Sequence, residues 1–154
     1  MVGSERGAAI LDQVSGDHHA SEMRRLHQLV PRLAAKDILV YDRAAGHYMG
    51  CALLRAGQVD LISRVHTRKI DWSAGQRLGP DERLVHWPKT QRKPAYLSPE
   101  EWTALPKELA VRILRVRVQQ KGFRSRMLVL VTTLLDAVAY PASEIAAAYP
   151  ESCS

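Results

Sequence analysis

A carboxylate and a guanidinium follow directly after a short apolar run in the first third of the chain. Residues 38–41 are Ile-Leu-Val-Tyr and come after a helix-like pattern, which predicts a buried parallel strand. Asp42 then falls at the C-terminal end of that strand, where open α/β sheets collect ligands and chemistry. A carboxylate held there can bind Mg²⁺ for phosphodiester chemistry, and Arg43 adds a donor suited to phosphate. The alternative is a surface aspartate that begins a turn.

A basic stretch in the second half of the chain is the other candidate for chemistry. It contains no Asp or Glu, and its cations are Arg112, Arg115, Arg117, Lys121, Arg124 and Arg126. On a strand, Arg115 and Arg117 share one face, while Leu114 and Val116 take the other. The pattern predicts a half-buried hairpin with a cationic outer face. That face could contact a DNA backbone, or its charges could protect an edge strand from pairing.

Other reactive residue types favour structural roles. Asp17, His18 and His19 indicate a solvated loop, because no second cluster lies at metal-ligand spacing. His47 either contacts a phosphate or is a polar residue at a helix start. Cys51 lies on the apolar side of a helix pattern and is predicted to be core. The three tryptophans, Trp72, Trp87 and Trp102, are predicted to pack in the core or in hairpins.

Composition indicates one globular domain, or a piece of a larger one. The 154 residues are 46% hydrophobic and 25% charged, which are globular values, and the net charge is +6. A basic balance suits an anionic partner such as nucleic acid. No apolar run approaches the roughly 18 residues of a membrane span, and the first residues lack an apolar signal core. With only two cysteines, the sequence predicts a cytoplasmic protein without a disulfide framework.

The first half of the chain alternates between strand and helix patterns. The predicted elements are a strand at 7–11, a helix from 23 that Pro31 kinks or ends, a strand at 38–41, a helix at 48–54 that stops at Gly57, and a strand at 59–65. This alternation is typical of an α/β arrangement with parallel strand pairing.

The second half is richer in strands. Residues 78–81 form a predicted turn before a strand at 83–87. Ser98, with Pro and Glu after it, predicts a capped helix start. Residues 109–118 and 126–135 predict an antiparallel hairpin. A last helix is expected over 141–149, with Ser143 as its candidate cap.

The order of these motifs resembles the insertion-sequence transposases of the DDE type, in the group whose ribonuclease-H-like domain carries a β-rich insertion. The matching segments are residues 7–12 (GAAILD), 21–22 (SE), 36–43 (KDILVYDR), 59–65 (VDLISRV), 81–89 (DERLVHWPK), 105–106 (LP), 111–112 (VR), 122–126 (GFRSR), 130–136 (LVTTLLD) and 140–141 (YP). The resemblance covers residues 7–149, and it depends on order and spacing more than on any single motif.

The resemblance implies an α/β (α+β) chain with a partial ribonuclease-H-like core. Residues 1–65 would form the core, 66–135 the β-rich insertion, and 136–154 the start of a truncated C-terminal core helix. In that family three carboxylates hold two Mg²⁺ ions, and Asp42 matches the second of them, as a catalytic residue and metal ligand. The first has no good match, because Asp12 and Asp17 lie in segments that resemble other strands. The third would follow the match of Tyr149, beyond Ser154.

The implied function is DNA transposition, with this chain as a fragment of the catalytic domain. The predicted DNA-contacting residues are Arg43, Arg64, Arg115, Arg117, Lys121, Arg124 and Arg126. The implied partners are transposon DNA and either a second copy or a complementing transposase fragment, with no membrane. The alternative is a catalytically inactive remnant that acts at most as a non-specific DNA-binding module.

Overall fold

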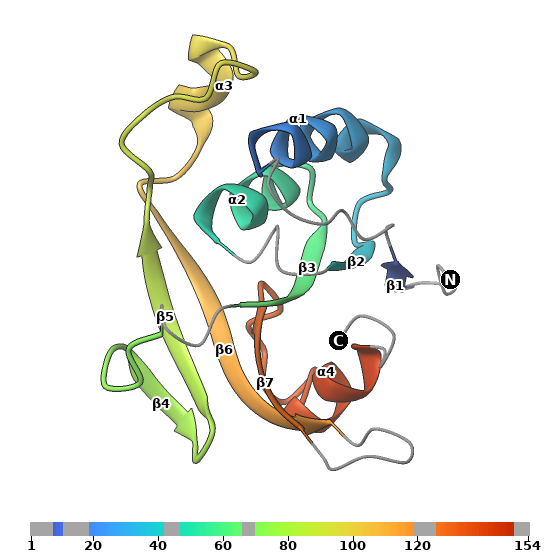
Figure 1. Cartoon of the computed structure of the whole chain (residues 1–154), viewed down its shortest axis with the longest axis vertical. Helices are drawn as coiled ribbons and strands as arrows, with labels where there is room; N and C mark the ends of the chain where they lie inside the picture. The colour runs from blue at the N-terminus through green and yellow to red at the C-terminus, as the bar shows by residue number, and fades with distance from the viewer. Residues whose placement is uncertain (1–7, 11–18, 42–46, 66–69, 119–125, 150–154) are drawn as a thin grey trace.

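The chain forms a mixed α/β structure around one seven-stranded sheet. The computed structural model describes residues 8–10, 19–41, 47–65, 70–118 and 126–149 (Figure 1). The strands are β1 (Ala8–Ile10), β2 (Ile38–Tyr41), β3 (Asp60–Arg64), β4 (Gln76–Gly79), β5 (Glu82–Pro88), β6 (Glu108–Val118) and β7 (Arg126–Thr132). Their order across the sheet is β1-β2-β3-β7-β6-β5-β4.

The sheet has a parallel half and an antiparallel half. Strands β1, β2 and β3 are parallel, as the alternation of strands and helices predicts. Strand β2 is buried at all four positions, because side chains on both of its faces meet apolar layers. Strand β7 joins the halves by pairing antiparallel with β3, and β6, β5 and β4 follow it antiparallel. The predicted core (residues 1–65) and the predicted insertion (66–135) therefore contribute strands to one continuous sheet. The division of the chain into three parts stays a prediction.

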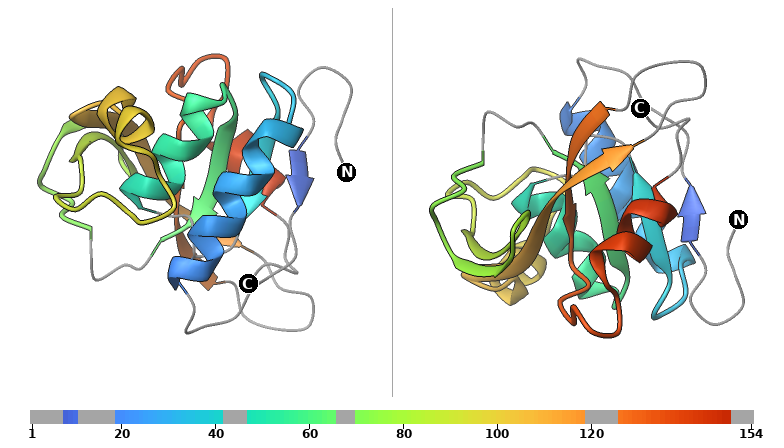
Figure 2. Two further views of the ribbon diagram at one scale, coloured as in Figure 1. Left: turned by 90° about the horizontal axis from the view of Figure 1, so that it is seen from above. Right: turned by 90° about the horizontal axis from the view of Figure 1, so that it is seen from below.

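Two helices cover one face of the sheet and a short helix covers the other. Helices α1 (His19–Leu29) and α2 (Tyr48–Ala56) lie on one side, and α4 (Ala142–Ala148) lies on the opposite side (Figure 2). Helix α3 (Pro99–Ala104) lies near α1, and His27 Nε2 and Glu101 Oε2 join the two at 2.8 Å. In the part of the chain that the structure describes, no helix is both long and apolar enough to span a bilayer.

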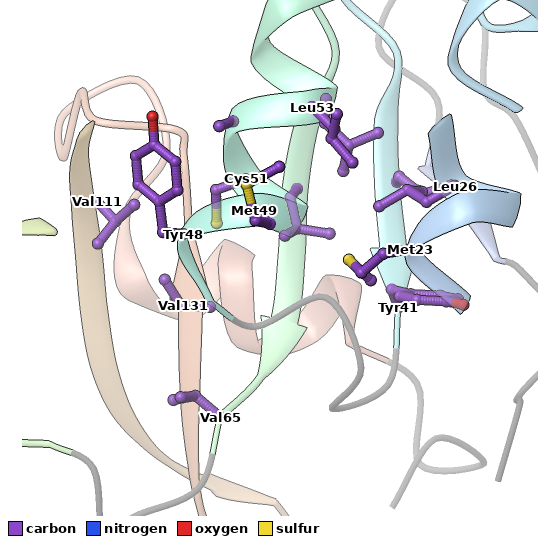
Figure 3. Close-up of a cluster of buried hydrophobic side chains, with 14 of the residues drawn as sticks. Met23, Leu26, Tyr41, Tyr48, Met49, Cys51, Leu53, Val65, Val111 and Val131 are labelled. Carbon is purple, nitrogen blue, oxygen red and sulfur yellow. The ribbon is translucent and has the colours of Figure 1, made fainter. Parts of the chain in front are cut away.

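Each helical layer has its own hydrophobic cluster. The larger cluster contains side chains of α1 and α2 together with Val111 and Val131 of the sheet (Figure 3). The smaller cluster lies under α4 and includes Ile145, Leu114 and Leu130. Successive residues of a strand point to opposite faces, so β6 and β7 contribute to both clusters.

The predicted helix ends are confirmed in most cases. After α1 the chain forms a 3₁₀ turn, Val30–Arg32, because Pro31 cannot continue an α-helix. Helix α2 stops at Gly57, where a Cβ would lie 2.4 Å from Cγ1 of Val30, so a larger residue would force Val30 or the backbone to shift. Ser98 forms the complete capping box with Glu101.

One predicted cap is wrong, and one strand was not predicted. Helix α4 has Pro141 as its N-cap residue, in an extended conformation, with no side-chain hydrogen bond. Ser143 lies inside the first turn of α4, so it is not the cap. Strand β4 has only four residues, none of them buried, and therefore lacks the apolar alternation by which strands are recognised.

Candidate nucleic-acid interface

Several predicted site residues lie on strands whose C-terminal residues are at the same end of the sheet. Strands β2 and β3 are parallel, and both β3 and β6 are antiparallel to β7, so β2, β3 and β6 run in one direction. Their C-terminal ends carry Tyr41, Arg64 and the pair Arg115 and Arg117. Asp42 and Arg43 come next in sequence after Tyr41, outside the described residues. We call this end of the sheet the basic end.

Arg115 and Arg117 are exposed on the face that carries α1 and α2. Near the end of β6 burial alternates as the sequence predicts, because Leu114 and Val116 are buried while Arg115 and Arg117 are exposed. Arg115 follows Ile113 at a spacing of two, and Ile113 belongs to the cluster under α1 and α2. Both guanidinium groups therefore lie beyond the region of that face that the two helices cover.

The remaining predicted DNA contacts are placed only in part. Arg64 is half-buried and pairs in register with Leu130, so it points to the α4 face, opposite Arg115. Arg126 begins β7 opposite Val118, and its side chain is not described. Lys121 and Arg124 lie outside the described residues.

Arg112 does not belong to the exposed basic surface, so its grouping with the other cations of the stretch is wrong. Its side chain is 0% exposed, and its Nε donates to Glu82 Oε2 at 2.8 Å. Its Nη1 donates to the carbonyl oxygens of Leu134 (2.8 Å) and Tyr140 (2.9 Å). The alternation of a strand could have predicted this burial, because Arg112 lies on the same face of β6 as the buried Leu114 and not on the face of Arg115.

Arg115 has two well-defined neighbours that sequence reasoning missed. Its Nε donates to Oδ1 of Asp81 at 2.9 Å, and its guanidinium carbon lies 4.5 Å from the ring centroid of Trp72. The backbone N–H of Arg115 also donates to the carbonyl oxygen of Asp81 at 2.9 Å. The side chains of Arg115 and Asp81 are 41% and 52% exposed, so the pair is accessible to a ligand from solvent.

Trp72 is held in place by a turn of its own. Asp71 Oδ1 accepts hydrogen bonds from the backbone N–H (2.9 Å) and the hydroxyl (2.5 Å) of Ser73. These bonds, the hydroxyl first, and the nearby Arg83 keep the pKa of Asp71 below its usual range. The sequence Asp-Trp-Ser carries this signal, since Asp side chains often bond the backbone two residues on. The predicted packing role of the tryptophans is confirmed, because all three contact the larger cluster.

The other candidate residues take structural positions. Cys51 is completely buried, and this burial raises the pKa of its thiol to about 12, so the prediction of a core residue is confirmed. His47 precedes α2 in an extended conformation without capping it through its side chain. Within the described ranges, no group of three or more His, Cys, Asp and Glu side chains could hold a metal ion.

Two cavities lie away from the basic end. One, of about 440 Å³, is lined mainly by apolar residues of α2, of the 3₁₀ turn after α1 and of the segment around α3, with His27 and Glu101 also in its lining. The other, of about 450 Å³, lies beside Asp60 and Leu109, near the starts of β3 and β6. Arg55 lines this second cavity and pairs with Asp60 at 3.3 Å. The two exposed arginine–aspartate pairs, Arg115–Asp81 and Arg55–Asp60, therefore mark opposite ends of the sheet.

Comparisons with family models, curated proteins and solved structures found no match to this chain.

Proposed function

We propose that this chain is part of the catalytic domain of a DDE-type transposase and that its basic end binds the DNA backbone. The observation that carries the proposal is strand direction. The two exposed arginines of β6 lie at the same end of the sheet as the C-terminal end of β2, which Asp42 follows in sequence. A ribonuclease-H-like core remains part of the proposal, and the mixed α/β sheet with three parallel strands is compatible with it.

Charge and side-chain chemistry support DNA as the ligand. The chain carries a net charge of +6, which favours a polyanion. Guanidinium groups match phosphate geometry better than ammonium groups, because their donors are arranged in a planar fork. Arg115 and Arg117 lie two residues apart on one exposed face, so both can approach one DNA strand.

The residues that the structure describes do not complete a two-Mg²⁺ centre with Asp42. Asp42 supplies at most two carboxylate oxygens, whereas two ions need carboxylates from several elements. The described residues add no cluster of three metal-binding side chains. DNA binding is therefore the activity that we propose for the chain by itself, with a second copy or a complementing fragment as the proposed source of carboxylates for strand cleavage. The same observation favours the alternative of a non-catalytic DNA-binding module.

Salt dependence of DNA affinity tests the binding surface. For the chain with both Arg115→Ala and Arg117→Ala, the slope of log affinity against log salt should fall by about 2, because each phosphate contact contributes about 0.9. Arg55→Ala is the matched control, since Arg55 is also 41% exposed and paired with an aspartate, but lies at the opposite end of the sheet. Equal slopes for the double variant and the unmodified chain would rule out the basic end as the DNA-binding surface.

Metal binding and cleavage test the transposase part of the proposal. Mn²⁺ should broaden NMR signals of residues next to Asp42, and Asp42→Asn should remove the effect. Supercoiled plasmid incubated with the chain and Mg²⁺ or Mn²⁺ should stay intact. If Mn²⁺ has no effect near residue 42, Asp42 is not a metal ligand. If nicking occurs and Asp42→Asn abolishes it, the chain completes its own site.

A further inference from the structure

A second feature of the basic end is the arrangement of two side chains, Trp72 and Asp81, around the guanidinium of Arg115. The guanidinium carbon of Arg115 lies over the ring of Trp72, and Asp81 accepts a hydrogen bond from Nε of Arg115. We propose that these three residues form a preorganised binding site for a single phosphate group, in which the two terminal amino groups of Arg115 bind two phosphate oxygens. The identification of that phosphate as part of DNA rests on the proposed function.

The loop that carries Trp72 is anchored at several points. The Asp71–Ser73 turn fixes the loop before β4, and the neighbouring Ile70 packs against the larger hydrophobic cluster. At the other end of the loop, Gly75 has a φ of +75°, and a Cβ there would lie 2.2 Å from the carbonyl oxygen of Leu84. The loop therefore follows β5 closely, and its backbone is held on both sides of Trp72.

Asp81 orients the guanidinium without covering its outer donors. The hydrogen bond uses Nε, on the side edge of the guanidinium plane. Among the residues that the structure describes, Asp81 is the one carboxylate within salt-bridge distance of Arg115. An ion pair this exposed contributes little to folding stability. Its consequence is geometric, because a guanidinium that is held at Nε and lies over the Trp72 ring keeps both Nη groups for bidentate binding of phosphate.

Two pairs of substitutions test the orientation of the Arg115 guanidinium while the charge stays equal within each pair. Asp81→Asn keeps the oxygen acceptor and removes the negative charge, while Asp81→Ala removes both. Because the two variants have equal charge, the Asn variant should bind inorganic pyrophosphate and duplex DNA about threefold more tightly than the Ala variant. Trp72→Phe keeps an aromatic face, so it should bind about threefold more tightly than Trp72→Leu.

The site itself can be observed in the intact chain by ¹⁹F NMR of fluorotryptophan. The protein has three tryptophans, and Trp72→Phe assigns the relevant signal. Titration with inorganic pyrophosphate, and separately with a DNA duplex, should shift the Trp72 signal saturably and leave the Trp102 signal unchanged, since Trp102 stacks with Lys89 instead. Arg115→Ala should abolish the shift.

The outcomes distinguish the site from the proposed function. A Trp72 shift with pyrophosphate but not with DNA supports the phosphate site and contradicts DNA binding at the basic end. DNA affinity that depends on Arg115 but is the same for Asp81→Asn and Asp81→Ala, with no Trp72 shift, contradicts the preorganised site and leaves DNA binding in place. The absence of a Trp72 shift with either ligand overturns the inference.

Discussion

Glu82 accepts a hydrogen bond from Nε of the fully buried Arg112 at 2.8 Å. The two residues lie on adjacent strands, β5 and β6, and Arg112 also donates to two carbonyl oxygens in the connection between β7 and α4. A buried cation is tolerated only when it is paired and hydrogen-bonded. This one side chain therefore joins the antiparallel half of the sheet to the segment that leads into α4.

Removal of Glu82 should be strongly destabilising. Glu82→Ala leaves the Arg112 charge buried without its counterion, which costs about 3–5 kcal/mol of unfolding free energy. The neighbouring Asp81→Asn is the control and should change stability by less than about 1 kcal/mol, because its ion pair is exposed. Urea unfolding measures both. A loss below about 1 kcal/mol for Glu82→Ala would show that the pair is not needed for stability.

Gly75→Ala should destabilise the loop under Arg115. At a φ of +75°, an alanine is strained, and its Cβ would clash with Leu84. We expect a loss of about 1–3 kcal/mol from the backbone strain, with the clash adding to it. Gly79→Ala is the control, since the nearest atom to its Cβ is 3.9 Å away. Thermal unfolding compares the two, and equal effects would mean that the loop adapts.

Ser98→Ala should weaken the start of α3. The hydroxyl of Ser98 accepts the backbone N–H of Glu101 at 3.1 Å, so its loss costs about 1 kcal/mol. Ser143→Ala provides the comparison, because Ser143 is exposed in the first turn of α4 without a capping role. That variant should stay within about 0.5 kcal/mol of the unmodified chain. A similar loss of stability in Ser143→Ala would show that Ser143 does cap α4.

Acid should weaken the Asp71–Ser73 turn in a defined pH range. The pKa of Asp71 is lowered in the folded chain, so the stabilisation is complete above the unfolded pKa of about 3.9 and is lost as pH falls through the lower folded pKa. Ser73→Ala removes the hydroxyl that contributes most to this shift, and it should raise the pKa of Asp71 in an NMR titration.

Asp136 is the internal control for that titration. Backbone N–H groups of Ala139 and Val138 lower its pKa, and Ser73→Ala leaves both donors in place. An unchanged Asp71 midpoint in the variant would show that the Ser73 hydroxyl is not the cause.

Cys51 should resist alkylation in the folded chain. Its thiol is buried and its pKa is raised to about 12, so very little reactive thiolate forms near neutral pH. In a Cys153→Ser variant, iodoacetamide should label Cys51 only in denaturant. Labelling of the folded chain at the rate of a free cysteine would contradict the buried position.

Local sequence patterns determined most of the elements. The apolar residues before Asp42, the position of Pro31 and the Ser98 capping box act through backbone angles and hydrogen bonds within a few residues. The alternation of buried and exposed residues from Leu114 to Arg117 likewise follows from the two-residue period of a strand. Each of these signals is complete within one segment, so the tertiary structure did not alter it.

Strand order and side-chain neighbours were decided only by the tertiary structure. Insertion of β7 between β3 and β6 sets which strand ends lie together, and this placed Arg64 and Arg115 on opposite faces. The same pairing buried Arg112 against Glu82, a residue distant in sequence, although Arg115 and Arg117 stayed exposed. Trp72 reached Arg115 because the loop before β4 lies along β5. These contacts join segments that are far apart in the chain. The register of the paired strands depends on which faces pack together, and no local pattern encodes that.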